Sequence, residues 1–383
     1  MDFVLRLALL YAGVFVAMGI QMPFLPVWLA AKGLDERAIG AALAAYSLAR
    51  VAAIPFVTHA ADRFARLHTA ILIAAAGTAL SFTLLGLAQG QLIFAALIVA
   101  GIAAAATLPL VEAYALHGLA TRGRAYGPVR LWGSAAYIIG NIAAGLISTV
   151  IAPVSLIWPL VAVYWASVLT ALGMRPLNAA PARRVATAGW RNLFGVPGLI
   201  PIVAAASLIQ ASHSLYYGFS TLQWSAGGLD GPSIGALWAV GVIAEIVLFA
   251  ASPRLPGWAS PAVLIVIGAA GGIVRWTAMA FDPPGTLLPV LQCLHALSFG
   301  TTHLGAVQFL TRAAPAGSAA SAQGFLATVM GVVSAGSMAV SGALFAAYGA
   351  HAYVAMALLA FAGGAVALAA GRRGQPQSAG SGG

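Results

Sequence analysis

Residues 33–41 read GLDERAIGA, and residues 228–236 read GLDGPSIGA. Six of the nine letters agree, at a constant offset of 195 residues. In each copy an aspartate or serine favours capping the start of the next helix, and a glycine allows close packing. We therefore interpret the two copies as equivalent loops in the two halves of a repeated fold, and as structural elements rather than ligand contacts.

The composition excludes an ordinary soluble domain. Of the 383 residues, 61% are hydrophobic and only 7% are charged, whereas soluble domains carry about 25% charged residues. Apolar runs of roughly 20 residues, long enough to cross a bilayer core of about 30 Å, recur along the chain, and in lipid they must be helices. The predicted spans lie near 5–31, 37–57, 69–87, 91–116, 128–150, 156–174, 197–220, 233–251, 261–281, 287–311, 323–346 and 352–371.

The net charge of +10 follows the predicted topology. With the N-terminus inside, the outer loops hold only Lys32 and Arg37, and the other loop and terminal basic residues lie inside. This bias predicts that both termini are cytoplasmic, and it makes nucleic-acid binding an unnecessary explanation of the charge. The single cysteine, Cys293, excludes an intrachain disulfide and a cysteine metal cluster. The inner set is Arg6, Arg63, Arg66, Arg122, Arg124, Arg175, Arg183, Arg184, Arg191, Arg254, Arg312, Arg372 and Arg373.

The predicted fold is an all-α membrane protein of twelve helices in two pseudo-symmetric six-helix bundles. Residues 1–174 form the first bundle, 175–196 a cytoplasmic linker, 197–371 the second bundle and 372–383 a disordered tail. Six plus six spans related as parallel repeats resemble the major facilitator architecture, in which the substrate site lies between the halves near the bilayer midplane.

Five ionisable residues fall inside predicted spans: Arg50, Glu112, Arg130, Glu245 and Arg275. Each costs about 2.5–3.5 kcal/mol on insertion scales, so each is a functional hypothesis by default. Three cations face two carboxylates, and an anionic ligand is the simplest way to balance the excess positive charge. The alternative is that Arg50 and Arg130, toward the cytoplasmic ends of their spans, extend to water.

Four residues of the second half are candidates for ligand and proton chemistry. Arg275 stays charged and can hold a carboxylate with two parallel hydrogen bonds. Glu245 is flanked by apolar residues, which favour its neutral form, while a nearby Arg275 favours the carboxylate; such opposed effects suit a proton carrier. His295 and His303, eight residues apart on one helix face, are further candidates for proton coupling. The alternatives are a permanent Glu–Arg structural pair and ordinary packing histidines.

Aromatic residues could stack on a ring-bearing substrate. The candidates are Tyr216, Tyr217 and Trp276, and the alternative is that they anchor the protein at the membrane interface. The loop THAADRFARLH (58–68) resembles the cytoplasmic signature of the major facilitator superfamily, so Asp62, Arg63 and Arg66 are candidates for a conformational latch. Thr58 and Ala65 stand where that signature has glycines.

Several longer stretches carry a more specific resemblance. YGPVRLWGSAAYIIGN (126–141), SLYYGFSTLQW (214–224), GGIVRW (271–276) and LQCLHALSFGTTHL (291–304) resemble the bacterial 3-phenylpropionate permease group of the major facilitator superfamily. More distantly, the pair Glu112 and Arg130, 18 residues apart, and the pair Arg275 and His295, 20 apart, match the spacing in the lactose permease group, where such residues contact substrate or lie close to it. The glutamate that releases the coupled proton there falls on Ser298, so the carrier here is expected to be Glu245 or His295.

The resulting prediction is a monomeric symporter of the bacterial inner membrane that imports a small aromatic carboxylate with a proton by alternating access. Its partners are an organic anion, protons and lipid; it needs no cofactor beyond the proton gradient and holds no metal. A proton-coupled sugar or nucleoside symporter that grips hydroxyls through Glu112 and Arg130 is one alternative. A non-transporting membrane receptor of the same fold is another, and an enzyme is disfavoured because no nucleotide loop or nucleophile motif is present.

Overall fold

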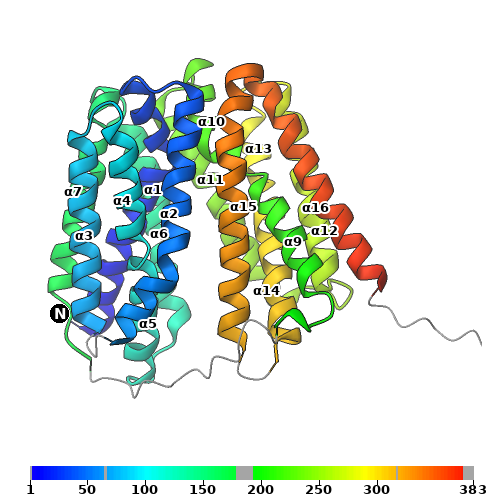
Figure 1. Ribbon diagram of the computed structural model, residues 1–383, viewed down its shortest axis with the longest axis horizontal. Coiled ribbons are helices and arrows are strands. Elements are labelled where there is room, and N and C mark those ends of the chain that lie inside the picture. The colour runs from blue at the N-terminus through cyan, green and yellow to red at the C-terminus, as the bar shows by residue number, and fades with distance from the viewer. Residues whose placement is uncertain (1, 64–66, 178–192, 316–317, 374–383) are drawn as a thin grey trace, which may run out of the picture.

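The computed structural model describes residues 2–63, 67–177, 193–315 and 318–373, with the side chains of 57–63, 319–320 and 372–373 outside that description (Figure 1). Every long element in this part of the chain is a helix. The first half contains α1 (Phe3–Ala31), α2 (Glu36–Arg63), α3 (Leu67–Leu87), α4 (Leu92–Ala104), α5 (Thr107–Ala120), α6 (Tyr126–Ile147) and α7 (Ile157–Leu172). The second half contains α9 (Leu199–Ala211), α10 (Ser214–Ala226), α11 (Gly231–Ala251), α12 (Pro261–Ala280), α13 (Leu288–Cys293), η3 (Ala296–Thr301), α14 (Thr302–Ala313), α15 (Ala319–Tyr348) and α16 (Tyr353–Arg373).

Each of the twelve predicted spans corresponds to one helix or to one interrupted helix. By length and composition, nine segments of the described chain can cross a membrane, and one of these, Ser321–Gly371, contains most of α15 and α16. The two remaining predicted spans are α6 and the α13–η3–α14 helix, and both carry polar side chains toward the interior. The fold is therefore an all-α membrane protein, consistent with twelve spans.

Three spans are interrupted, and the interruptions lie where polar groups gather. A short turn separates α4 from α5, another separates α9 from α10, and η3 is a π-helical segment between α13 and α14. π-Helical segments often mark functional sites because they turn side chains out of the regular register. Here the second turn places His213 at the start of α10, and η3 follows His295 directly.

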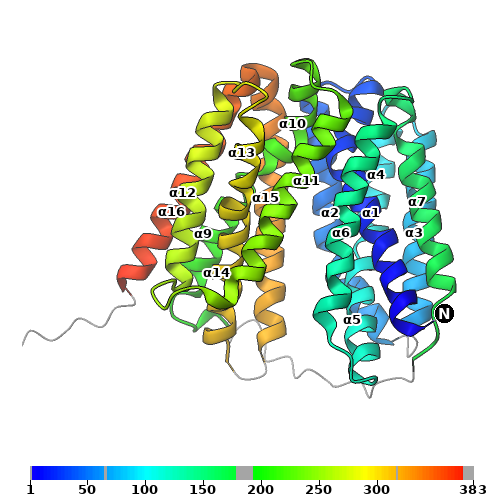
Figure 2. The same cartoon turned by 180° about the vertical axis from the view of Figure 1, so that it is seen from behind.

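The two halves meet at one end of the molecule and separate toward the other. We call the end that carries both copies of the repeated phrase the repeat end, and the end that carries Phe3 and Arg373 the terminal end. The ribbons of the two halves diverge toward the terminal end in both side views (Figures 1 and 2). Both ends of the described chain thus lie on the same side of the bundle. The predicted linker is largely outside the described residues, so its bounds stay a prediction.

The repeated phrase is a turn followed by a helix cap in both halves, as the sequence predicts. Gly33 and Gly228 have φ angles of 87° and 88°, a left-handed conformation that favours glycine. Two residues later, Asp35 accepts a hydrogen bond of 2.8 Å from the backbone N–H of Ala38, and Asp230 accepts one of 2.9 Å from Ser233. These contacts satisfy N–H groups that a helix start leaves without a partner.

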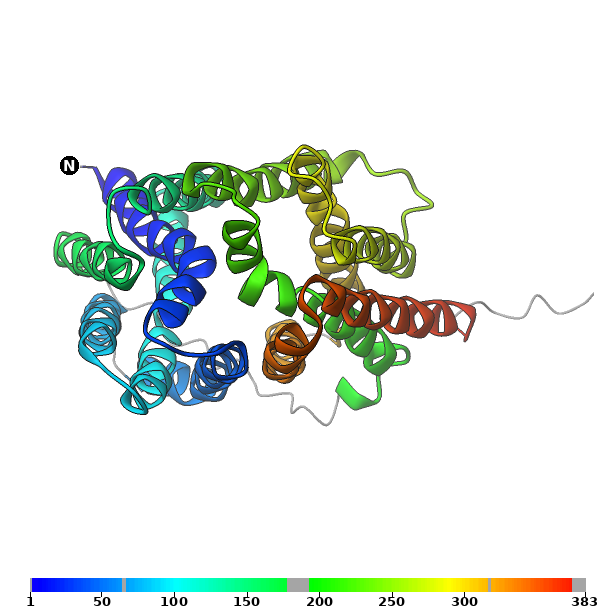
Figure 3. The same ribbon diagram turned by 90° about the horizontal axis from the view of Figure 1, so that it is seen from above.

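The second glycine of the phrase, Gly40 or Gly235, lies at the contact between the halves rather than in the turn. A Cβ atom on Gly40 of α2 would lie 2.7 Å from Cα of Gly342 on α15, and one on Gly235 of α11 would lie 2.5 Å from the backbone oxygen of Asn141 on α6. The view from above shows α15 beside α2, and α11 beside α6 (Figure 3). Small residues let helix backbones approach this closely in membranes. The phrase therefore repeats because each copy builds the same contact with the opposite half.

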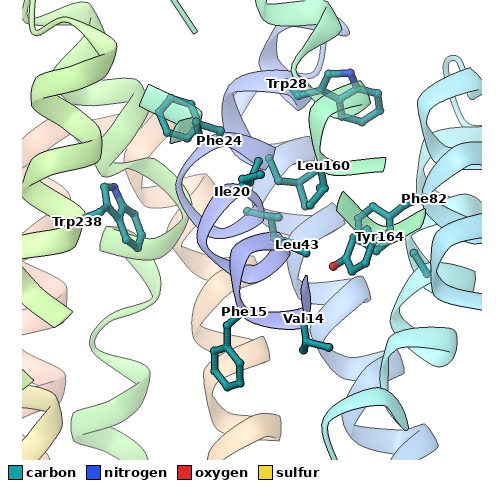
Figure 4. Close-up of a cluster of buried hydrophobic side chains, with 14 of the residues drawn as sticks. Val14, Phe15, Ile20, Phe24, Trp28, Leu43, Phe82, Leu160, Tyr164 and Trp238 are labelled. Carbon is teal, nitrogen blue, oxygen red and sulfur yellow. The ribbon is translucent and has the colours of Figure 1, made fainter. Parts of the chain in front are cut away.

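The apolar core continues through both halves. In the first half, side chains from α1, α2, α3 and α7 converge around Phe82, Leu160 and Tyr164 (Figure 4). Val14 and Phe15 are neighbours in sequence but point to different sides of α1 in the same view. Large apolar residues such as Leu80 and Ile139, 53% and 60% exposed, cover the outer surface, as expected of a surface in contact with lipid.

Candidate functional site

An ion pair lies in the first half where the two halves diverge. Nε of Arg130 on α6 donates to Oε1 of Glu112 on α5 at 3.0 Å. The hydroxyl of Tyr11 donates to Oε2 of Glu112 at 2.8 Å, and the hydroxyl of Tyr126 donates to the same oxygen. The Arg130 guanidinium also lies over the ring of Phe15, 4.3 Å from its centroid. The carboxylate is therefore well satisfied by donors.

This pair is open rather than sealed. The side chains of Arg130 and Glu112 are 31% and 25% exposed. Only Nε of the guanidinium is used in the ion pair, so the N–H groups of its two terminal nitrogens are available to a further acceptor. The predicted extension of Arg130 to bulk water is therefore not needed, since its partner lies on the neighbouring helix. Tyr11 and Tyr126 were not among the sequence candidates, because no sequence spacing connects them to Glu112.

Arg275 lies at the centre of the second half. Its side chain has no exposed surface, and its guanidinium lies between the rings of Tyr216 and Trp276, with centroids 4.5 and 4.6 Å away. One terminal nitrogen donates to Oε1 of Gln292 at 2.6 Å, and the other lies 3.0 Å from Nδ1 of His295. Cation–π contacts and neutral acceptors thus surround this charge, and within the described chain no carboxylate forms an ion pair with it.

His295 connects Arg275 to Glu245. A guanidinium only donates, so Nδ1 of His295 must be the acceptor, and in a neutral ring the proton is then on Nε2. That nitrogen lies 3.7 Å from Oε2 of Glu245. The predicted neighbourhood of Glu245 and Arg275 is thus present with one residue between them. Gln292 is the other hydrogen-bond partner of Arg275. It was not a sequence candidate, because a spacing of 17 residues gave no indication of this contact.

Glu245 also faces the first half. Its side chain is 21% exposed, in contrast to His295 at 10%. It lies on α11, which packs against α6, the helix that carries Arg130. The two centres therefore lie on helices that meet at the boundary between the halves.

The aromatic candidates Tyr216 and Trp276 belong to a packed cluster in the second half. Tyr216 stacks on Trp238 with centroids 4.6 Å apart, and Trp276, with no exposed surface, donates from its ring N–H to Ser212 at 2.9 Å. Both Tyr216 and Trp276 are sealed around Arg275 in this conformation. Tyr217 is more open than Tyr216. A direct substrate contact by these rings stays a prediction.

A second histidine, His213, was outside the main sequence candidates but lies inside this cluster. Its Nε2 lies 3.0 Å from the hydroxyl of Ser298, and its ring lies 5.4 Å from that of His295. Ser298 occupies the position at which the lactose permease group carries its proton-releasing glutamate. In this chain that position serves to hold His213.

The remaining candidates lie apart. His303 contacts the rings of Phe299 and Phe249, at centroid distances of 6.1 and 6.4 Å, and it has no ion pair in the part of the chain that is described. Its proton-coupling role stays a prediction. Of the latch residues Asp62, Arg63 and Arg66, the last and the side chains of the first two lie outside the described residues.

Comparisons with known proteins identify the family. The family described as MFS_1 like family matches residues 4–355. A probable 3-phenylpropionic acid transporter of Escherichia coli (strain K12) is 32% identical over 309 residues, covering 79% of this chain and 81% of that protein. A maltose permease of Geobacillus stearothermophilus is 29% identical over 316 residues, covering 80% and 78%.

Solved structures give the same assignment at the level of the fold. The crystal structure of a mutant form of the nucleoside transporter NupG superimposes with a TM-score of 0.86 over 96% of this chain and 100% of that one, at 16% sequence identity. Together with the helical membrane fold and the buried charges, these matches show that the chain belongs to the MFS_1 like family and is a transporter of the major facilitator superfamily, not an enzyme.

Proposed function

We propose that this transporter imports a small aromatic carboxylate, of the 3-phenylpropionate type, together with a proton across the bacterial inner membrane. The observation that carries the proposal is the uneven charge balance of the interior. Glu112 forms the ion pair of Arg130, while Arg275 has only neutral acceptors among the described side chains. A negatively charged ligand compensates the excess, and the relative at 32% identity is a probable transporter of such an acid.

The arrangement of the halves supports alternating access. If both termini are cytoplasmic, as the basic residues predict, the terminal end faces the cytoplasm and the conformation is inward-facing. Arg130, at 31% exposure, is then the cation that an incoming or departing carboxylate meets first. Arg275 is sealed, so any contact of its own with the ligand belongs to another conformation.

Glu245 is the residue that we assign to the proton. It is partly exposed on α11, which packs against α6 at the boundary between the halves, and its carboxylate lies 3.7 Å from His295. His295 already accepts from Arg275, so it is suited to hold Glu245 in place as a neutral donor. If Glu245 binds one proton for each monoanion that is carried, the loaded transporter has the same net charge as the empty one. That neutrality lowers the cost of moving the halves past each other through lipid.

A sugar or nucleoside symporter is the second candidate. The open Glu112–Arg130 pair favours it, because a carboxylate and a guanidinium together can grip hydroxyl groups. The maltose permease relative at 29% identity points the same way. In this alternative Glu112 contacts the ligand, whereas in the acid hypothesis it serves to position Arg130.

Uptake into proteoliposomes distinguishes the two candidates. The purified chain is reconstituted, and uptake of labelled 3-phenylpropionate, maltose and a nucleoside is measured with and without an inwardly directed proton gradient. We expect accumulation of 3-phenylpropionate that depends on the gradient and does not respond to an imposed membrane potential. Gradient-driven uptake of maltose or the nucleoside, with none of the acid, would overturn the proposal.

A further inference from the structure

A second polar region lies further along α1 and α5 from the Glu112–Arg130 pair, with Met18 and Leu108 in its wall. It is a cavity of about 180 Å³ whose walls come from α1, α2, α3, α7 and the α4–α5 turn of the first half. Tyr217 of α10 and Met338 of α15 close it from the second half. Val14 of α1 faces this cavity, whereas its neighbour Phe15 contacts Arg130 (Figure 4). The cavity and the ion pair are therefore neighbouring regions along the same two helices.

Arg50 supplies the charge of this cavity. It lies on α2, 14 residues from Glu36 and 13 from Arg63, which is about 20 Å from either helix end at 1.5 Å per residue. Only Glu36–Phe56 of this helix is the candidate membrane span, so Arg50 lies six residues, or about 9 Å, from the end of the span on the terminal side. Among the described side chains no carboxylate pairs with it. Arg50 is thus a cation inside the span that lines the cavity and has no ion pair among the described side chains.

The polar wall beside Arg50 is rich in donors. Tyr164 donates its hydroxyl to Oε1 of Gln21 at 2.6 Å, which leaves the amide N–H groups of Gln21 to donate elsewhere. Both residues line the cavity. A guanidinium and an amide NH₂ together match a group that only accepts hydrogen bonds, and a carboxylate is such a group.

The rest of the wall is apolar and adaptable. Met18, Met22 and Met338 line the cavity together with leucine side chains, and methionine side chains fit irregular shapes readily. An apolar cavity of about 150 Å³ in another protein binds benzene. At about 180 Å³ this one has room for a single ring with a short side chain.

We propose that this cavity is a subsite for the transported acid, with the carboxylate on Arg50 and Gln21 and the ring among the methionines. The proposal rests on the aromatic-acid function above and names the residues that select the ligand. Arg130 then serves the passage to and from the terminal end, and Arg50 serves the bound state. Because Tyr217 and Met338 belong to the second half, a ligand here contacts both halves at once. Tyr217 also lies 6.5 Å from the ring of His295, which joins the subsite to the proton site.

Equilibrium binding to the purified full chain tests the carboxylate contact. Calorimetry measures 3-phenylpropionate and its uncharged amide on the native chain, on Arg50→Gln and on the control Arg254→Gln, whose arginine is exposed at the terminal end. We expect Arg50→Gln to weaken binding of the acid by about tenfold to hundredfold, the range for hydrogen bonds to a charged group, and to leave the amide unchanged. Arg254→Gln should behave as the native chain.

The outcomes separate this inference from the function on which it rests. If the native chain binds no aromatic acid, the proposed function fails and the subsite fails with it. If the native chain prefers the acid and Arg50→Gln keeps that preference, only the subsite is refuted.

A second variant tests the proposal even if Arg50→Gln does not fold, because it is expected to gain binding of a larger ligand. Met18→Ala enlarges the cavity, so it should admit 3-(2-naphthyl)propionate, which the native cavity is too small to hold. Met174→Ala removes an equally large side chain from the core outside the cavity and should not admit it. If Met18→Ala binds 3-phenylpropionate normally but shows no preference for the larger ring, the ring does not occupy this cavity.

Discussion

The contact between α2 and α15 at the repeat end gives the sharpest prediction, which is that Gly342→Ala shifts the transporter away from the conformation described here. A methyl group on Gly342 would lie 2.5 Å from the backbone oxygen of Glu36 and 3.0 Å from Cα of Gly40. Ordinary van der Waals contact begins near 3.4 Å. Both obstacles are backbone atoms, so no rotamer change relieves them. The two helices, which belong to different halves, must therefore separate by about 0.9 Å.

Overpacking of this kind costs about 1–3 kcal/mol. Since 1.4 kcal/mol is a factor of ten, the population of the conformation with a closed repeat end should fall by about 5- to 150-fold relative to one in which α2 and α15 are apart. The same change also favours the helix itself by about 1 kcal/mol, because glycine is a poor helix former. Gly336→Ala isolates that effect, since it lies on the same helix and a Cβ there meets nothing within 4 Å.

Distances between pairs of spin labels measure this shift in conformation. In a Cys293→Ser background, labels at positions 37 and 286 report on the repeat end, and labels at positions 121 and 311 report on the terminal end. All four positions are exposed. We expect Gly342→Ala to lengthen the first distance and shorten the second, with a matching loss of transport, and Gly336→Ala to leave both as in the native chain.

Identical distance distributions in Gly342→Ala and Gly336→Ala would refute the reasoning, because they would mean that the glycine contact does not hold the repeat end closed. A thermal melt of both variants separates this outcome from general unfolding. A large loss of stability in Gly342→Ala without a change in either distance would likewise contradict the prediction.

Three further substitutions test the charged groups. Glu245→Gln should keep exchange of labelled for unlabelled acid but abolish uphill uptake, because the amide cannot carry a proton; normal accumulation would remove Glu245 from coupling. Glu112→Gln should slow uptake of the acid only moderately, since Tyr11 and Tyr126 can still donate to the amide oxygen; complete loss of binding would favour the sugar alternative. Arg275→Lys keeps the charge but not the two-armed contact with Gln292 and His295, so we expect at least a tenfold loss in uptake rate with the protein still folded, measured alongside a melting curve, and native uptake would exclude a positioning role.

The repeated phrase shows which features of the fold could be predicted from the sequence. A fixed offset of 195 residues, apolar runs of span length and the excess of inner arginines gave two helical halves. The loop and the aspartate caps were also predictable, because helix capping is local. The left-handed conformation of Gly33 and Gly228 was not among the predictions. The role of Gly40 and Gly235 as contacts between the halves was predicted only as close packing, since the partner helices, α15 and α6, are far away in sequence.

The sequence also identified the ionisable residues inside the predicted spans, but it could not show which of them contact each other. From the sequence, Arg275 was the leading candidate for a carboxylate, and Arg50 and Arg130 had the alternative of extending to water. Their environments differ completely in the structure: Arg130 has Glu112, Arg275 has Gln292 and His295, and Arg50 faces a cavity.

By itself, then, the chain determines that it spans the membrane as helices, that its halves repeat and that its interior carries more cations than acids. These are properties of hydropathy and composition, which every segment displays without reference to the others. Only the tertiary structure decides that Arg130 has an acidic partner, that Arg275 is buried among aromatic rings and that Arg50 lines a cavity. Pairing and enclosure depend on the distances between side chains of different helices, and packing fixes those distances to within a few tenths of an ångström.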